Sequence, residues 1–243
     1  MSLSDLCDLH CHYVPSVDDG VKSAAEGVLL CRRLAEIGYT TVVATPHMRT
    51  GMFDNDRARL VAAYQQFKTE AEGEAGLPEL GLGCEHFLDE TFMERLARGE
   101  TLPYPGEHAA LVEFPPERLP VRLDDSLFRM RVRGFRPVIA HPERYAPLWQ
   151  SSEPLEHLVD RGALALLDTM SLVGKYGRKS KAAAERLLDD GLYFAACTDS
   201  HKPADVEVVA QAIERLVGLC GEAHARALLA ENPRHILAGT VAD

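Results

Sequence analysis

Several features of common protein classes are missing from this 243-residue chain. No apolar run approaches the roughly 18 residues that a membrane-spanning helix needs, so we expect no insertion into a bilayer. The opening Met1-Ser2-Leu3-Ser4 has neither the basic nor the apolar region of a signal peptide. We expect residues 1–4 to be a cloning remnant or disordered, and the protein to be cytoplasmic.

Positive charge is also scarce. Lys and Arg number 26 against 37 Asp and Glu, which gives a formal net charge of -11. Nucleic-acid binding depends on clustered Lys and Arg, so this balance argues against a nucleic-acid partner. The excess of carboxylates suits a protein that binds several divalent cations.

The six cysteines include no Cys-x-x-Cys pair, and we expect them to be buried free thiols in a reducing compartment. Cys220 and Arg226 have the C-x5-R spacing of thiol-based tyrosine phosphatases. That chemistry needs a thiolate in a glycine-rich anion-binding loop at a helix start. Here Glu222 would repel a phosphate and the segment has a helical pattern, so we interpret the spacing as coincidence.

Strand-like and helical patterns alternate along the whole chain, without an internal repeat, a low-complexity stretch or a linker. Strands are predicted at 6–12, 40–44, 80–84, 109–112, 137–140, 163–167 and 193–197. About seven such units predict one α/β domain over residues 1–243 with a parallel sheet. We favour a closed barrel, because it brings strand ends from the whole sequence to one mouth.

Histidines and carboxylates recur where these strands end, which is where active sites lie in parallel α/β folds. On the first strand, Asp8, His10 and His12 are expected on one face and the residues between them on the other, because strand side chains alternate. The strand-end residues are His10, His12, His47, Glu85, Glu113, His141, Asp199 and His201. These nitrogen and oxygen ligands suit Mn, Fe, Zn or Mg, and they are too many for one ion.

Clustered divalent cations favour phosphoester hydrolysis, because they activate water and neutralise phosphate charge. Arg144 follows His141 by three residues and offers a planar fork for phosphate oxygens.

Seven motifs in this order resemble the PHP (polymerase and histidinol phosphatase) superfamily, most closely its bacterial tyrosine-phosphatase branch of the CpsB/YwqE type. They are Asp8-x-His10-x-His12, Asp18-Asp19-Gly20, Thr45-Pro46-His47, Glu85, Glu113-Phe114, His141-Pro142-Glu143-Arg144 and Asp199-Ser200-His201. The resemblance implies a distorted (β/α)7 TIM-like barrel and a metal-dependent protein-tyrosine phosphatase. It further implies a phosphotyrosine substrate, such as the tail of a bacterial tyrosine kinase in capsule or exopolysaccharide synthesis.

The resemblance also implies three divalent ions, with manganese expected first and Fe, Zn or Mg as alternatives. The implied ligands are His10, His12, Glu85 and Asp199 for one ion; Glu85, Glu113 and His141 for a second; Asp19, His47 and His201 for the third. Arg144, Glu113 and Asp199 are the implied catalytic residues. Only the family register favours Asp19 over Asp18 as a ligand, whereas Asp8 and Glu143 are expected to orient their neighbours.

One position departs from the family pattern. The branch carries an arginine shortly after its last metal histidine, whereas this chain has only Lys202 there. Arg49 and Lys202 are therefore candidates, beside Arg144, for substrate binding. Two other functions stay open: a phosphoesterase for a small molecule such as histidinol phosphate, and a non-catalytic regulator that keeps metals for stability.

Overall fold

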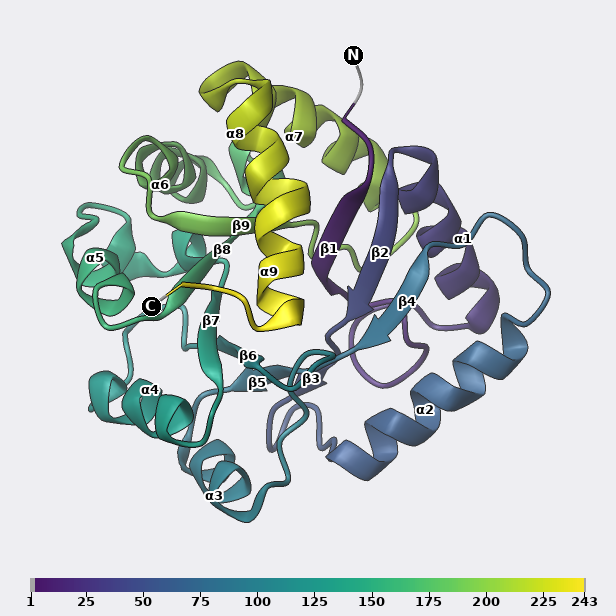
Figure 1. Ribbon diagram of the computed structural model, residues 1–243, viewed down its shortest axis with the longest axis horizontal. Coiled ribbons are helices and arrows are strands. Elements are labelled where there is room, and N and C mark those ends of the chain that lie inside the picture. Colours follow the sequence, from purple (N-terminus) through teal and green to yellow (C-terminus); the bar gives the residue numbers. More distant parts are fainter. Residues whose placement is uncertain (1–2, 243) are drawn as a thin grey trace.

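The computed structural model describes residues 3–242, which form parallel strands surrounded by helices (Figure 1). The strands are β1 (Leu6–Cys11), β2 (Tyr39–Ala44), β3 (His47–Met48), β4 (Glu79–Leu82), β5 (Glu85–Phe87), β6 (Ala109–Glu113), β7 (Arg136–Ala140), β8 (Leu164–Asp168) and β9 (Tyr193–Cys197). They form two sheets, in the orders β1-β2-β4 and β3-β5-β6-β7-β8-β9. The predicted α/β fold with parallel strands is confirmed.

At two of the seven predicted strand positions, 40–44 and 80–84, the observed strand is followed after a break of two residues by a second short strand, which accounts for the two additional strands. β2 and β3 are separated by Thr45 and Pro46, and a proline has no N–H to donate to a ladder. The amide of Gly83 donates to the carbonyl of Ala44 at 2.8 Å, and that of Glu85 to the carbonyl of Pro46 at 3.2 Å. These bonds carry the pairing across both interruptions, so seven strand positions follow one another around the molecule.

β1 and β9 meet at their carboxyl ends, where Asp199 N donates to His10 O at 2.8 Å and His12 N donates to Ser200 O at 2.9 Å. Toward the amino ends of the same two strands, the π-helical η4 (Ala227–Glu231) and α9 (Asn232–Ala238) pack against both, and Arg234 donates to the carbonyl of Asp5. The side-chain Nδ2 of Asn232 donates to the carbonyl of Phe194 on β9 at 2.7 Å. This bond pairs a backbone carbonyl of β9, and α9 lies across the ring of strands (Figure 1).

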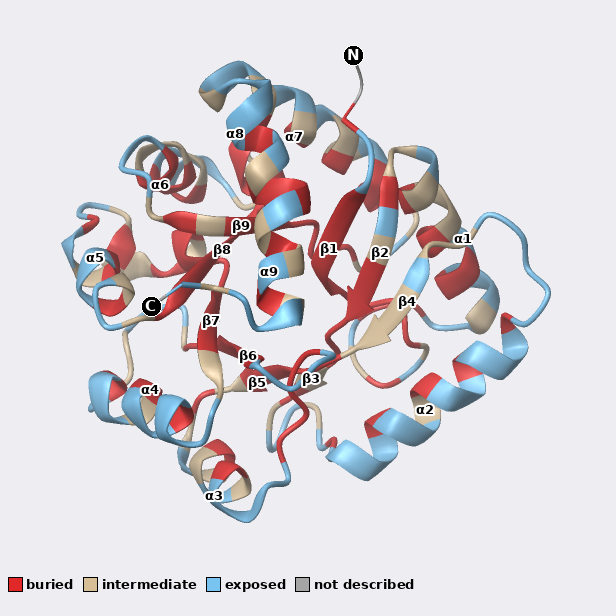
Figure 2. Ribbon diagram, viewed as in Figure 1, coloured by how far each residue is buried: buried red, intermediate tan, exposed pale blue. Residues whose placement is uncertain are grey.

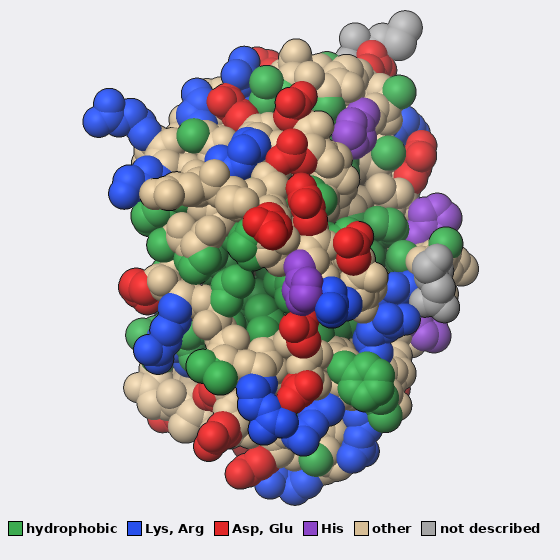
Figure 3. All heavy atoms as spheres, turned by 90° about the vertical axis from the view of Figure 1, so that its left-hand side faces the viewer, with side chains coloured by type: hydrophobic (Ala, Val, Ile, Leu, Met, Phe, Trp, Pro, Cys, Tyr) green, Lys and Arg blue, Asp and Glu red, His purple; other side chains and the backbone are tan. Residues whose placement is uncertain are grey.

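Helices surround the strands and present their buried faces to them (Figure 2). Their bounds are α1 (Ala24–Glu36), α2 (Arg57–Glu70), α3 (Glu90–Arg98), α4 (Leu123–Val132), α5 (Glu153–Val159), α6 (Arg178–Asp189), α7 (Asp205–Cys220) and α8 (Glu222–Arg226), with short 3-10 turns η1 (Pro142–Arg144), η2 (Ala146–Leu148) and η3 (Thr169–Val173). On the face formed by α4, α5 and α6, acidic and basic side chains are intermixed (Figure 3). In residues 3–242, no helix has the length and apolar character required to cross a membrane.

The core has an inner cluster, drawn almost entirely from the strands, and an outer cluster beneath the helices. Cys7 and Leu9 belong to the inner cluster, but Cys11 belongs to the outer one. The strict alternation predicted for the first strand is therefore wrong, because the register of β1 shifts between Asp8 and Cys11.

Two predictions about the chain's chemistry can be compared with the fold. All six cysteines are free thiols, and five of them are buried, while Cys220 is half-buried. Of the four residues predicted to be a cloning remnant or disordered, residues 1 and 2 lie outside the described chain. Leu3 is only 8% exposed and is part of the outer core cluster.

Candidate metal centre

The strand ends bring together all nine side chains that were proposed as metal ligands. Their donor atoms fall into four overlapping groups, and within each group all atoms lie within 4.8 Å of one another. The groups are His12, Asp19, His47 and His201; His10, His12 and Glu85; His10, His141 and Asp199; and His47, Glu85 and Glu113. Because the groups share members, they describe one continuous cluster rather than separate sites.

Glu85, the first residue of β5, lies at the centre of this cluster and is 1% exposed. Its Oε2 is 3.0 Å from His10 Nε2 and 3.1 Å from His47 Nδ1, while its Oε1 is 2.9 Å from His141 Nε2. Burial by itself raises the pKa of Glu85, but His10 and His47 outweigh that effect and hold it well below the usual value. Glu85 can therefore serve as a carboxylate shared by neighbouring cations.

Asp199 follows β9 and points into the same cluster. Its Oδ1 lies 3.1 Å from His10 Nε2 and 3.2 Å from His12 Nε2. Asp199 and His141 both have left-handed backbones, with φ of 46° and 33°. Such conformations are uncommon for residues other than glycine and occur often at functional sites, where they aim a side chain.

The geometry separates Asp18 from Asp19. Asp18 Oδ2 accepts from His12 Nδ1 at 2.7 Å and from the backbone amide of His47 at 3.1 Å, so this carboxylate orients two histidines. Asp19 has a half-exposed side chain, and its Oδ1 lies 3.6 Å from His47 Nε2 and 3.5 Å from His201 Nε2. Asp19 is therefore the better placed of the two to bind a cation, in agreement with the family register.

Asp8 lies outside the four donor groups and joins strands. It accepts from Thr198 N at 3.0 Å, from Thr198 Oγ1 at 2.6 Å and from His10 N at 3.2 Å, which ties β1 to the end of β9. Burial raises the pKa of Asp8 to about 6.

Glu143 also lies outside the donor groups. It accepts from Asp168 N, Ser171 Oγ and Tyr193 OH at 3.1, 2.9 and 3.0 Å. Burial raises its pKa to about 7. Its contacts hold β8, η3 and β9 together beneath the site.

The unpaired atoms of the cluster test whether cations fit there. Within residues 3–242, four buried atoms that face the cluster have no hydrogen-bond partner: His12 Nε2, His47 Nδ1, Glu113 Oε1 and Asp199 Oδ1. Burying polar atoms without partners is costly, and such atoms are rare in native proteins. Divalent cations would satisfy a set of imidazoles and carboxylates like this one, so the residues fit metal binding.

Arg144 closes one side of the cluster. Its Nη2 donates to carboxylate oxygens of both Asp168 and Asp199, and its Cζ lies 3.7 Å from the ring centre of Tyr176. Its Nε is buried without a hydrogen-bond partner. Asp168 was missed from the sequence, although it directly follows the predicted strand 163–167 and could have been found by the same strand-end rule.

A cavity of about 580 Å³ opens beside the cluster and forms its mouth. Its lining includes Asp19, Arg144, Lys175, Tyr176, His201 and Lys202. Arg49, by contrast, lies with its Cζ 4.0 Å over the ring of Phe87 on β5. Lys175 and Tyr176 carry no motif that could have identified them from the sequence.

Comparison with known proteins gives this arrangement a family. The family described as "Capsular polysaccharide synthesis, CpsB/CapC" matches residues 6–238. The chain belongs to this family. It is 30% identical to the tyrosine-protein phosphatase YwqE of Bacillus subtilis (strain 168), over 81% of this chain and 77% of that protein. It is 27% identical to the tyrosine-protein phosphatase CpsB of Streptococcus pneumoniae, over 96% of this chain and 98% of that protein.

Solved structures agree with the family assignment. A structure from a study of YwqE and CpsB, described as "unique metal-dependent tyrosine phosphatases", has a TM-score of 0.87 and 28% identity, covering 96% of this chain and 94% of that one. The dihydroorotase of Campylobacter jejuni has a TM-score of 0.53 at 13% identity, over 100% of this chain and 85% of that one. The latter likeness concerns the fold alone.

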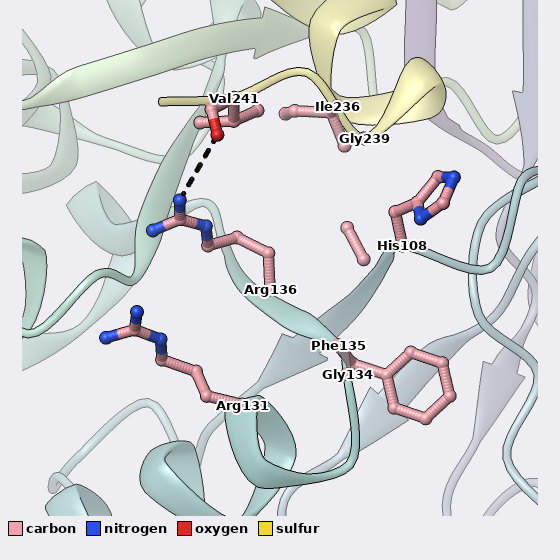
Figure 4. A pocket seen from close by; sticks show the side chains of 9 residues that line it. His108, Arg131, Gly134, Phe135, Arg136, Ile236, Gly239 and Val241 are labelled. Atoms are coloured by element: carbon pink, nitrogen blue, oxygen red, sulfur yellow. Dashed lines mark hydrogen bonds between the residues drawn. The ribbon is translucent and has the colours of Figure 1, made fainter. Parts of the chain in front are cut away.

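A separate cavity of about 290 Å³ lies at the amino ends of β6 and β7, at the opposite end of the strands (Figure 4). Arg136 extends across it and donates to the carbonyls of Val241 and Ala242 at 3.4 and 3.0 Å. These contacts secure the end of the chain, and none of the nine clustered side chains lines this cavity.

The C-x5-R spacing does not form a thiol phosphatase loop. Cys220 is the last residue of α7 and Arg226 the last of α8, and the Cys220 thiol donates to the carbonyl of Leu216 at 3.2 Å. The carbonyl end of a helix disfavours a thiolate, and burial also raises the pKa of Cys220. The interpretation of this spacing as coincidence agrees with the geometry.

Proposed function

We propose that this protein is a metal-dependent tyrosine-protein phosphatase that hydrolyses phosphotyrosine. The observation that carries the proposal is the cluster of nine nitrogen and oxygen ligands with Arg144 beside it. Relatives with the matched sequence are named tyrosine-protein phosphatases, which supports the same activity here.

We propose three divalent cations, manganese first, with Fe, Zn or Mg as alternatives. The four overlapping donor groups and their unpaired buried atoms support more than one ion. When bound, clustered divalent cations activate a water for attack on phosphorus and neutralise phosphate charge.

The contacts of individual side chains support the roles proposed for them. Arg144 binds phosphoryl oxygens through the guanidinium N–H groups that Asp168 and Asp199 do not engage. Asp199 contributes to the metal cluster and also orients Arg144. Glu113, whose Oε1 lies 3.2 Å from His47 Nδ1, completes the cluster on the β6 side. Arg49 and Lys202 remain candidates for contacts to the substrate.

The proposed partner is a tyrosine-phosphorylated protein, such as the tail of a bacterial tyrosine kinase in capsule or exopolysaccharide synthesis. The family description supports the capsule context. The six free cysteines support a reducing cytoplasm. The absence of a nucleic-acid partner stays a prediction from the net charge.

The test compares turnover of a phosphotyrosine peptide, a phosphoserine peptide and histidinol phosphate by the metal-reconstituted protein. We expect the phosphotyrosine peptide to have the highest kcat/KM. A preference for histidinol phosphate would indicate a small-molecule phosphoesterase. Metal binding without hydrolysis of any phosphate ester would indicate a non-catalytic regulator.

A further inference from the structure

The mouth cavity has more cations than the family pattern indicates. Besides Arg144, its lining includes Lys22, Lys175 and Lys202. A phosphate monoester carries between one and two negative charges near neutral pH, and it has several oxygens to be bound. Arg144 already uses Nη2 on two carboxylates, so a second protein cation would complete the binding of a phosphate.

Lys175 is held in place by specific contacts. It lies two residues after η3, and its Nζ is 3.0 Å from Asp205 Oδ1 and 3.2 Å from Met170 Sδ. An ammonium group has three N–H donors, so these contacts leave one donor for a ligand. The side chain is 28% exposed and borders the cavity, so a ligand can reach it.

Asp205 connects Lys175 to the metal cluster. This carboxylate is buried, and its Oδ2 accepts from the amides of His201 and Lys202 at 3.0 and 3.2 Å. His201 is a member of the donor group with Asp19. One carboxylate therefore fixes both the segment that carries His201 and the ammonium of Lys175.

Tyr176 places the two cations beside the same ring. Arg144 Cζ lies 3.7 Å from its ring centre, and Lys175 Nζ lies 5.7 Å from it. Both distances fall in the range of cation–π contacts, which orient a cation as well as attract it.

The other two lysines are less restricted. Lys202 has an exposed side chain, and only its backbone amide is bound by Asp205. Lys22 is exposed, and its Nζ donates to the carbonyl of Asp18 at 3.0 Å. A side chain that is already ordered loses less conformational entropy on binding, which favours Lys175.

We propose that Lys175, positioned by Asp205, is the second cation that binds the substrate phosphate together with Arg144. The inference rests on the proposed function only in requiring a phosphate ester as substrate.

The test measures binding of inorganic phosphate to the metal-loaded protein by calorimetry, together with hydrolysis of an aryl phosphate. Lys175→Met should weaken phosphate binding about ten-fold, as expected for one lost charge-assisted hydrogen bond, and Lys175→Arg should restore most of it. Lys179→Met is the matched control, because it removes an equal charge that lies over Trp149 instead of lining the cavity. Its phosphate affinity should stay within about two-fold of the parent.

Thermal unfolding and metal analysis accompany each variant, because a merely structural ion pair predicts a different result. Lower melting temperature with unchanged phosphate affinity in Lys175→Met would overturn the proposal, as would a loss seen only in Lys202→Met. If Lys175→Met does not fold, Lys175→Met/Asp205→Asn removes the stranded carboxylate and is compared with Asp205→Asn alone. The double variant should then bind phosphate more weakly, and equal binding would refute a role for Lys175.

Phosphate binding separates this inference from the proposed function. A protein that binds phosphate through Lys175 but does not prefer phosphotyrosine would contradict the function and retain the inference. If the metal-loaded parent hydrolyses phosphotyrosine, and Lys175→Met leaves both phosphate binding and product inhibition unchanged, the function is retained and the inference is contradicted.

Discussion

Replacement of Arg144 by alanine should reduce both stability and activity, for separable reasons. The change removes the cation that pairs with Asp168 and Asp199, which are 0% and 2% exposed. Removing one partner of a buried ion pair costs about 3–5 kcal/mol, because the remaining charge stays buried. Arg144 itself is 21% exposed, so we expect the low end, a loss of about 3 kcal/mol in the free energy of unfolding.

The loss of activity should come from the transition state. A charge-assisted contact to developing phosphoryl charge is worth about 2–4 kcal/mol, so kcat/KM for an aryl phosphate should fall roughly 30- to 1,000-fold. The loss should exceed that in Arg49→Ala, because Arg49 lies over Phe87.

A double variant separates the two effects. Arg144→Ala/Asp168→Asn removes one of the two carboxylates that lose their cation, while an amide oxygen remains to accept from Met170 N. The other, Asp199, still faces His10 and His12. Chemical denaturation should show that part of the lost stability is recovered, whereas steady-state kinetics should still show the low kcat/KM. Parent-like turnover in Arg144→Ala, or turnover restored in the double variant, would refute the role of Arg144 in binding phosphate.

Three further predictions concern the metals, the ligands and the core. Chelation should abolish aryl phosphate hydrolysis, and Cys220→Ser should leave it nearly unchanged. Activity that survives chelation but is lost in Cys220→Ser would show that the thiol, and not the metals, carries the reaction. Glu85→Ala should lose more bound metal and more activity than Asp8→Ala, because Glu85 touches three histidines whereas Asp8 joins backbone segments; full metal occupancy in Glu85→Ala would contradict this. Burial lowers the pKa of His86 to about 4, whereas the unfolded chain titrates near 6.5. The unfolded state therefore binds more protons between these values, and stability is lost as pH falls below 6.5, by about 2 kcal/mol from about pH 7 to about pH 5. Denaturation curves of the parent and His86→Gln should differ in this pH slope, and equal slopes would contradict the prediction.

The sequence predicted the architecture because strand and helix patterns are local. β-branched and apolar runs such as 40–44 and 137–140 mark buried strands wherever they occur in a parallel α/β fold. The strand-end rule then found the cluster, since parallel strands place their carboxyl ends at one mouth. His47 and Asp199 are 152 residues apart, yet both could be assigned to that mouth from position alone.

The contacts between side chains of different strands could not be predicted, because they depend on register and backbone detail. The register shift of β1 between Asp8 and Cys11 places Cys11 in the outer core cluster, apart from Leu9, and no residue pattern indicated it. Asp18 and Asp19 are chemically identical neighbours, and only their distances from His12 and His201 assign them different roles. The packing of η4 and α9 against β1 likewise joins segments from opposite ends of the chain.

The sequence by itself determined most of the chemical groups that reach the mouth, because they lie at or within a few residues of the end of a predicted strand. Only the tertiary structure decided how those groups share atoms. It placed Glu85 between three histidines, set Arg144 against Asp168, and anchored Lys175 on Asp205. These contacts join segments far apart in sequence, and their energies depend on distances of a few ångströms that no local pattern encodes.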